Sequence, residues 1–240
     1  MKTVINDSTN PYYNLALEEF LLKNDSITED LFYVWRNDKS IVIGRNQNPF
    51  LEVDMDYVLK NKIPIVRRIS GGGTVFQDLG NINFTFITNN ISEHLNNYHY
   101  FLDPVIKILN NLGLKTYFVE KSHIYLEHKK ISGNAQSYYK NKVIHHGTLL
   151  FDSNLEILSL CLKPRYDNQN VIKSVMAKTT NIKSYLNLEA ETSEFMEYLL
   201  SNVFVDDYRS HIMELSDDDK NRVEKLVLEK YGTDKWNLNK

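Results

Sequence analysis

The chain has 240 residues, a formal net charge of −3 and one cysteine, so it has the length of one large domain or of one domain with a small appendage. The small negative charge gives no support to a nucleic-acid-binding protein, which normally carries a basic face, and a single cysteine excludes an intramolecular disulfide. Because no run of 18 or more apolar residues is present and the N-terminal MKTVINDSTN lacks an apolar signal core, we expect a cytoplasmic protein without a membrane partner.

The first half of the chain predicts one helix followed by several short strands. Asn10 is a favourable N-cap, Pro11 suits the first helical position, and an apolar stripe continues the helix to Lys23. Alternating or β-branched runs then predict strands at 31–36, 40–44, 63–69 and 81–88, with a short helix at 54–61.

The second half predicts more helix. A helix at 98–111 ends at the stop signal Gly113, and strands at 115–119, 124–131 and 143–151 precede helices at 154–162 and 193–204. Ser216 and the three aspartates after it begin a terminal helix that Gly232 ends, with no further element expected. This order favours an α+β fold with mixed, largely antiparallel sheets flanked by helices over a regular βαβ alternation.

Cys161 is a poor candidate for a nucleophile. It falls in the apolar segment LEILSLCLKP, where burial would raise the pKa of its thiol. No spacing of Cys and His typical of metal ligands appears, so we expect no metal site built by the chain.

The most informative segment is RRISGGGTVFQDLGNINF, from Arg67 to Phe84, in which three glycines lie between two strand-like runs. Glycine permits positive φ and close backbone approach, so successive N–H groups can surround an anion. Most glycine-rich turns bind nothing, but a plain hairpin does not need the polar residues that flank this one: Arg67, Arg68, Ser70, Gln77, Asp78, Asn81 and Asn83. We therefore expect a phosphate site at the glycines, with both arginines beside it.

A second polar segment, KKISGNAQSYYKNKVIHHGTLLFD, runs from Lys129 to Asp152. Both lysines could be ordinary exposed strand ends, and His145 and His146 could point to opposite faces of a strand. Lys130, however, precedes a Ser-Gly segment that we expect to turn, much as Arg68 does. We expect this lysine to approach the glycine-lined anion site.

In these segments the chain resembles the lipoate-protein ligases of the biotin/lipoate protein ligase family. The resemblance rests on NPYYNLALEEFLL, IVIGRNQN, VRRISGGGTVFQDLGNINFTFI, KKISGNAQ and HHGTLLFD, which occur in the family's order, and more weakly on TTNIKSYL. It implies a ligase-like catalytic domain at residues 1–206. Residues 207–240 would form a helical linker or the stub of a C-terminal accessory domain that is otherwise absent.

The resemblance implies ATP-dependent attachment of lipoate to a lysine of an acceptor lipoyl domain through lipoyl-AMP. ATP and lipoate would be substrates, with Mg²⁺ accompanying the nucleotide, and the acceptor would be a dehydrogenase E2 subunit or a glycine-cleavage H protein. Two alternatives on the same fold are a lipoyl or octanoyl transferase that does not itself use ATP and a non-catalytic lipoyl-binding relative.

The resemblance also implies roles for particular residues. Lys130 would be the catalytic residue, stabilising charge at the reacting acyl-phosphate group. The nucleotide site would comprise Arg68, Gly73, Thr74, Val75, Phe76, Gln77, Asn81 and Lys130. The lipoyl site would comprise Arg68, Ser70, Gly71, Gly72, Asn83, Lys130 and His146.

Three segments depart from the family pattern. Lys121, Ser122 and His123 stand where Arg-Asn-Asp is common, Ser137 stands where an arginine often follows SGNAQ, and Met176 and Lys178 stand where two arginines are usual. Serine and methionine lack the bidentate phosphate contact of arginine, so we expect weaker phosphate binding from these positions.

Overall fold

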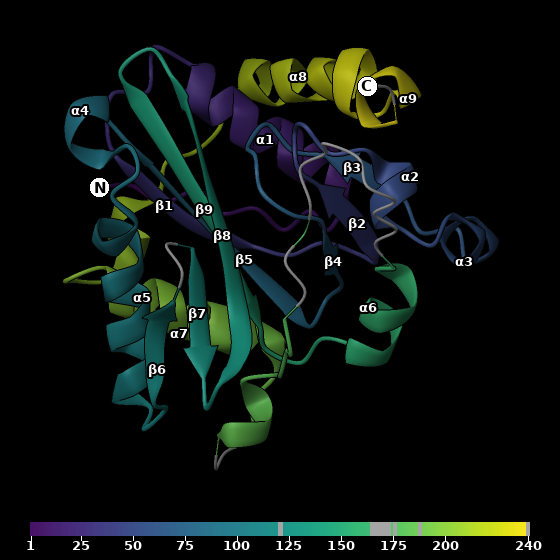
Figure 1. Ribbon diagram of the computed structural model, residues 1–240. Helices are drawn as coiled ribbons and strands as arrows, with labels where there is room; N and C mark the ends of the chain where they lie inside the picture. Colours follow the sequence, from purple (N-terminus) through teal and green to yellow (C-terminus); the bar gives the residue numbers. More distant parts are fainter. Residues whose placement is uncertain (120–121, 164–173, 175–176, 187–188, 239–240) are drawn as a thin grey trace.

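The computed structural model of the chain describes residues 1–119, 122–163, 174, 177–186 and 189–238, which form two β-sheets with helices packed around them (Figure 1). One sheet is antiparallel throughout and the other is mixed. The prediction of an α+β fold with largely antiparallel sheets is therefore confirmed.

The larger sheet carries several of the buried polar residues of the candidate site, among them Asn83, Thr85 and His146. Its neighbouring strands are all antiparallel, in the spatial order β1 (Leu31–Trp35), β5 (Asn81–Thr88), β9 (Lys142–Leu150), β8 (Lys129–Tyr139), β7 (His123–Leu126) and β6 (Thr116–Val119). Strand β5 is buried at every position. Polar side chains on its Asn83 and Thr85 must therefore find partners inside the protein.

The smaller sheet frames the glycine turn. Its central strand β2 (Ser40–Ile43) pairs in parallel with β3 (Ile65–Arg67) and antiparallel with β4 (Val75–Gln77). The chain leaves β3 on one side of β2 and enters β4 on the other, so the intervening glycines must cross the end of β2.

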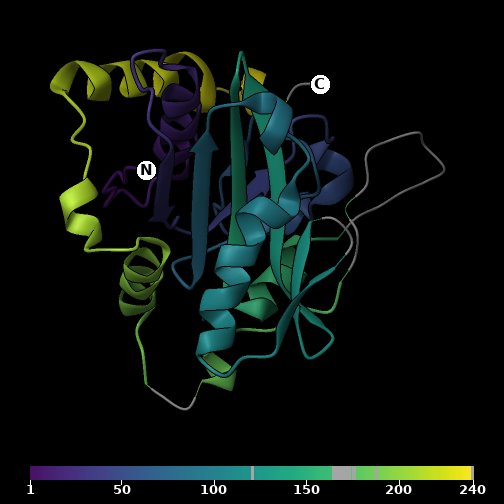
Figure 2. The same cartoon turned by 90° about the vertical axis from the view of Figure 1, so that its left-hand side faces the viewer.

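Helices cover both faces of the larger sheet. On one face, α5 (Tyr98–Asn111) and α7 (Thr192–Val203) pack on a core that includes Phe32 and Phe84, and Figure 2 shows α5 crossing the strands. On the other face lies α1 (Pro11–Lys23), which begins as predicted because the side chain of Asn10 accepts hydrogen bonds from two backbone N–H groups of the first turn. Among the described residues, no helix is long and apolar enough to cross a bilayer.

The remaining helices are short. Those packed around the smaller sheet are α2 (Pro49–Glu52), α3 (Met55–Lys60) and α6 (Leu155–Cys161). The others are α4 (Ile91–His94), η1 (Lys183–Tyr185) and η2 (Tyr208–His211).

The C-terminal segment lies along α1 (Figure 1). Ser216 caps α8 (Asp217–Leu226) as predicted, a π-helical turn η3 (Val227–Tyr231) follows, and Gly232 ends it. The expectation of no further element is wrong, because Asp234–Asn237 forms a helical turn, α9, against β3. The proposed division between residues 1–206 and 207–240 stays a prediction.

The segment around Lys130 also differs from the prediction. The expected strand at 124–131 is two strands, since the chain turns at Glu127 and His128, both of which have positive φ. The expected turn at Ser132 and Gly133 is absent, because these residues continue β8 and pair with β7. Lys130 therefore lies near the start of a long strand.

Candidate active site

The glycine turn is held in shape by the side chain of Arg68. Its Nη2 donates to the carbonyl oxygens of Gly71 at 2.6 Å and Gly73 at 2.8 Å, and its Nε donates to Ser70 Oγ at 3.0 Å. Gly72 has a φ of 90°, which glycine adopts readily. Burial lowers the pKa of Arg68 to about 10, and the Glu18 carboxylate opposes that shift. The guanidinium thus remains a cation at neutral pH and fixes the turn.

A loop after β2, residues 44–47, packs directly against this turn. A Cβ at Gly44 would lie 2.1 Å from the carbonyl oxygen of Gly72, so the close approach requires glycine. Gln47 Oε1 accepts from the N–H of Gly44 at 3.0 Å and from Thr74 Oγ1 at 2.9 Å. Gln47 was not predicted as a site residue, and the motif IVIGRNQN was its only signal in the sequence.

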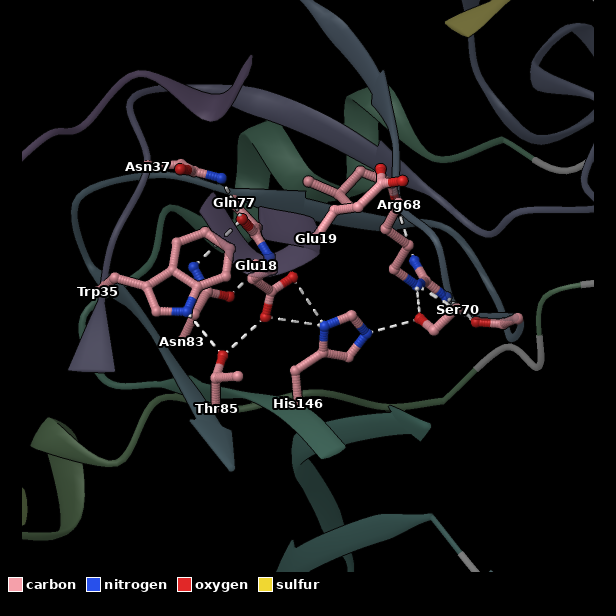
Figure 3. A network of polar contacts seen from close by, with 12 residues as sticks. Glu18, Glu19, Trp35, Asn37, Arg68, Ser70, Gln77, Asn83, Thr85 and His146 are labelled. Carbon is pink, nitrogen blue, oxygen red and sulfur yellow. Dashed lines mark hydrogen bonds and ion pairs between the residues drawn. The ribbon is translucent and has the colours of Figure 1, made fainter. Parts of the chain in front are cut away.

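Behind the turn, a chain of hydrogen bonds links three elements (Figure 3). Ser70 Oγ lies 2.5 Å from His146 Nε2, and His146 Nδ1 lies 2.9 Å from Glu18 Oε2. Since the Glu18 carboxylate only accepts, Nδ1 of the imidazole carries the proton that it donates to Glu18, and Nε2 of the neutral ring then accepts from the Ser70 hydroxyl. The buried Glu18 also accepts from Thr85 Oγ1 at 2.7 Å.

A second group of buried amides lies beside Glu18 (Figure 3). Gln77 Nε2 donates to Asn83 Oδ1 at 2.7 Å, and Asn37 Nδ2 donates to Gln77 Oε1 at 2.7 Å. Asn81 Nδ2 also donates to Asn83 Oδ1, at 3.2 Å. The buried Oδ1 of Asn81 accepts no hydrogen bond from the described residues.

Two adjoining cavities open at the turn. The first has a volume of about 290 Å³, and its lining includes the apolar side chains of Leu15, Trp35 and Val42. The second has a volume of about 390 Å³ and is lined partly by Leu150, Leu155 and Leu158. Thr74, Val75 and Lys130 line both cavities, whereas the turn glycines Gly72 and Gly73 line only the first.

Lys130 lines both cavities. Its backbone N–H donates to Lys178 and its carbonyl accepts from Thr180, so a second chain segment fixes the strand at this point. A methyl group added at Gly133 would lie 3.3 Å from Lys130 Nζ, which shows that the lysine side chain lies over that glycine.

Most of the predicted site residues lie on these cavities. Those that line the first are Arg68, Gly72, Gly73, Gln77, Asn83 and His146; those that line the second are Phe76 and Asn81; those that line both are Thr74, Val75 and Lys130. Ser70 and Gly71 are not among the lining residues, and Ser70 instead lies between Arg68 and His146. Sequence reasoning missed Glu18 and Trp35, both of which line the first cavity.

The departures from the family pattern fall in different places. His123 lines the first cavity and Lys178 lines the second, whereas Ser137 is not among the described lining residues of either. Lys121 and Met176 lie outside the described residues. Lys178 is therefore a second lysine, besides Lys130, that lines the second cavity.

No group of three or more His, Cys, Asp or Glu side chains suited to a metal ion occurs in the part of the chain that the structure describes. Mg²⁺ usually takes one or two protein carboxylates together with substrate phosphates. We therefore assign no protein ligand set to Mg²⁺.

Comparison with known sequences identifies relatives over nearly the whole chain. Residues 10–204 match the family model described as the lipoyl protein ligase A/B catalytic domain. Lipoate-protein ligase 1 of Staphylococcus aureus is 38% identical over 244 residues, which cover 99% of this chain and 73% of the relative.

Two solved structures share the fold. A lipoate-protein ligase A bound with ATP superimposes with a TM-score of 0.79 at 24% identity, covering 99% of this chain and 98% of the other. A bi-partite lipoate protein ligase of Thermoplasma acidophilum, described with its E2 lipoyl domain, gives a TM-score of 0.79 at 23% identity, covering 99% and 95%. At such identities these similarities establish the fold alone.

Proposed function

The chain belongs to the lipoyl protein ligase A/B catalytic domain family, and on that basis we propose how its reaction proceeds. The chain is a lipoate-protein ligase, an enzyme that attaches lipoate to protein at the expense of ATP. The intermediate, the site residues and the acceptor are our proposals.

The proposed reaction has two steps. First, a carboxylate oxygen of lipoate attacks the α-phosphorus of ATP, the bond to the β-phosphate oxygen breaks, and lipoyl-AMP and pyrophosphate form. Second, the amine of an acceptor lysine attacks the lipoyl carbonyl carbon, the bond to AMP breaks, and the amine releases its extra proton. Because the substrates supply both nucleophiles, the enzyme contributes mainly alignment and charge stabilisation.

One observation carries this proposal: Lys130 lines both the first cavity, whose lining includes apolar side chains, and the second cavity. We assign the lipoyl chain to the first cavity, the nucleotide to the second and the mixed anhydride to their shared wall. Lys130 would then stabilise the negative charge that develops when the α-phosphate is attacked.

The first cavity suits an acyl chain. Leu15, Trp35 and Val42 line it, and burying the four chain CH₂ groups of lipoate against them would contribute about 3 kcal/mol. Arg68, Gly72, Asn83 and His146 line the same cavity, which supports their assignment to the lipoyl site, and Ser70 and Gly71 would act from behind its wall by holding Arg68 and His146.

The second cavity suits a nucleotide. Phe76 and Asn81 line it alone, Thr74 and Val75 line both cavities, and the free acceptor on Asn81 supports a hydrogen bond from the nucleotide. Arg68, Gly73 and Gln77 would contact the phosphate side from the first cavity. Mg²⁺ would arrive on the phosphates of ATP, and no step here is routed through it.

Lipoate ligases act on lipoyl domains, and we propose a dehydrogenase E2 subunit or a glycine-cleavage H protein as the acceptor. Intact-mass measurement of each domain after incubation with the enzyme, lipoate and ATP tests the function. We expect the mass to rise by one lipoyl group only when ATP is present. Modification from free lipoate without ATP, or none with ATP and either acceptor, would overturn the proposal.

A further inference from the structure

Arg67 and Arg68 are adjacent in the chain, but their side chains bind different parts of the protein. Arg68 supports the glycine turn from within, whereas Arg67 is absent from the described linings of both cavities. The sequence-based expectation that both arginines border the anion site therefore applies to Arg68 alone. The reason is the alternation of side chains along a strand, which sends consecutive residues to opposite faces.

The Arg67 guanidinium binds the loop that supports the glycine turn. Its Nη1 donates to three carbonyl oxygens of residues 44–47: Gly44 at 3.1 Å, Arg45 at 3.0 Å and Gln47 at 2.7 Å. The other face of the same loop contacts the turn, because the N–H of Arg45 donates to Ser70 O at 2.8 Å and Gln47 binds Thr74.

The same guanidinium is held by the C-terminal segment. Its Nε donates to Trp236 O at 2.8 Å and its Nη2 donates to Asn237 O at 3.0 Å. The backbone of Arg67 is hydrogen-bonded to the same segment. Its N–H donates to Asn237 Oδ1 at 2.9 Å, and its carbonyl accepts from Trp236 Nε1 at 2.8 Å. We call residues 227–237 the C-terminal bracket.

The bracket is anchored at its other end to α1. Asn237 Nδ2 donates to Tyr231 O at 2.6 Å, and Tyr231 Oη donates to the buried Glu19 carboxylate at 2.6 Å. Lys230 Nζ also binds Glu19, at 2.5 Å. Glu19 binds the bracket, while its neighbour Glu18 lines the first cavity. The two carboxylates point in different directions (Figure 3). One helix therefore fixes both the cavity wall and the bracket.

We propose that Arg67 is a positioning residue for the adenylation step and that Trp236 and Asn237 of the C-terminal bracket hold it in place. This inference rests on the proposed function. By holding the carbonyl side of loop 44–47, the bracket would set the position of Gln47, which accepts a hydrogen bond from Thr74, a residue that lines both cavities. Small displacements of such groups reduce reaction rates strongly.

The inference predicts a selective defect. Leu15 and Trp35 supply apolar surface to the first cavity, and the indole N–H of Trp35 donates to Thr85 rather than to the bracket. Affinity for lipoate alone should therefore stay within about twofold when the bracket is weakened. The KM for ATP should rise about five- to tenfold, the size expected if the displaced turn loses one hydrogen bond to the nucleotide.

The test uses Asn237→Ala, which removes the side-chain contacts to Arg67 N–H and to Tyr231. It also uses Trp236→Phe, which removes the indole donor to Arg67 O and leaves a smaller aromatic ring next to Lys230 and Tyr231. Val223→Ala is the matched control, since Val223 is buried where α8 packs on α1 and makes no contact with Arg67 in the hydrogen-bond network. Lipoate-dependent pyrophosphate exchange gives the KM for ATP, and calorimetry gives the affinity for lipoate.

Amide hydrogen exchange tests the structural effect of the bracket independently of the enzymatic reaction. Asn237→Ala should speed amide exchange at residues 44–47 and 70–74, whereas Val223→Ala should lower the unfolding midpoint without that local change. If amide exchange at these residues were equal in Asn237→Ala and wild type, the proposed role of the bracket would be wrong. Equal KM values for ATP in the two proteins would also contradict it. A wild-type protein without pyrophosphate exchange would instead overturn the proposed function.

Discussion

His146 of β9 and Glu18 of α1 are 128 positions apart in the chain and form a buried hydrogen bond, with 2.9 Å between His146 Nδ1 and Glu18 Oε2. The carboxylate also accepts from Thr85, and the imidazole also accepts from Ser70 next to the glycine turn. Helix α1, the larger sheet and the turn are thereby joined through one carboxylate at the wall of the first cavity.

Replacing this carboxylate by an amide should destabilise the fold. In Glu18→Gln an NH₂ group takes the place of one acceptor oxygen, so a donor is brought against His146 Nδ1 or the Thr85 hydroxyl in a buried setting, and the two hydrogen bonds to Glu18 are weakened. We expect the free energy of unfolding, measured with urea, to fall by about 1–3 kcal/mol.

The exposed Glu29→Gln is the control, with an expected change below about 0.5 kcal/mol. If Glu18→Gln were as stable as wild type, the carboxylate would not be accepting both hydrogen bonds.

A second histidine should make stability depend on pH. His145 is fully buried, its ring stacks on Phe101 with centroids 4.6 Å apart, and burial, aided by His146, lowers its pKa well below 6.5. The unfolded chain binds the proton near pH 6.5 and the folded chain only at lower pH. Stability from His145 is thus present above pH 6.5 and is lost as pH falls toward the folded pKa.

His145→Phe preserves the ring stack and removes the titration, so its free energy of unfolding should fall less between pH 7.5 and pH 5 than that of wild type. The exposed His99→Phe should leave the wild-type decline unchanged. Parallel declines in wild type and His145→Phe would refute this assignment.

Cys161 should be inert. It is fully buried, and burial followed by the Asp54 charge raises the pKa of its thiol to about 11. The contribution of this thiol to stability is complete below pH 9 and is lost as pH rises through 11.

At pH 8 we expect thiol labelling to be slow in the folded protein and fast in denaturant, and we expect Cys161→Ala to keep its turnover within about twofold, since Cys161 does not line either cavity. Loss of turnover in this variant would point to an acyl-thiol route instead.

The sequence correctly predicted the ends of those helices that are capped by residues close to them in the chain. Asn10 and Pro11 specify the start of α1, Ser216 specifies the start of α8, and Gly113, with a φ of 82°, follows α5. In each case the capping residue and the backbone it satisfies lie within a few positions of one another.

Distant contacts explain the failures. The Gly133 region has the composition of a turn, yet it is a strand because residues of β7 and β9 pair with it. Gly147 is needed within the sheet, where a Cβ would lie 1.8 Å from Asn134 Oδ1. Helix α9 is too short to be predicted from periodicity and is held by Arg67, 170 positions away from Asn237.

Prediction of the candidate site was limited in the same way by contacts between residues far apart in the chain. The glycines and Lys130 stood out from composition and motif, and the structure brings them to one pair of cavities, while their roles stay predictions. Glu18 and Gln47 were missed because their importance lies in partners that come together only in the fold, such as His146 and Thr74.

The most direct test of the account is lipoate-dependent exchange of labelled pyrophosphate into ATP by wild type, Lys130→Ala and Lys129→Ala. Lys129 is the matched control, because its Nζ donates to Tyr185 Oη at 3.2 Å and it is not among the described lining residues of either cavity. We predict exchange by wild type and Lys129→Ala, and exchange about 100-fold slower by Lys130→Ala at an unchanged unfolding midpoint. Near-normal exchange by Lys130→Ala, or none by the folded wild type, would contradict the account.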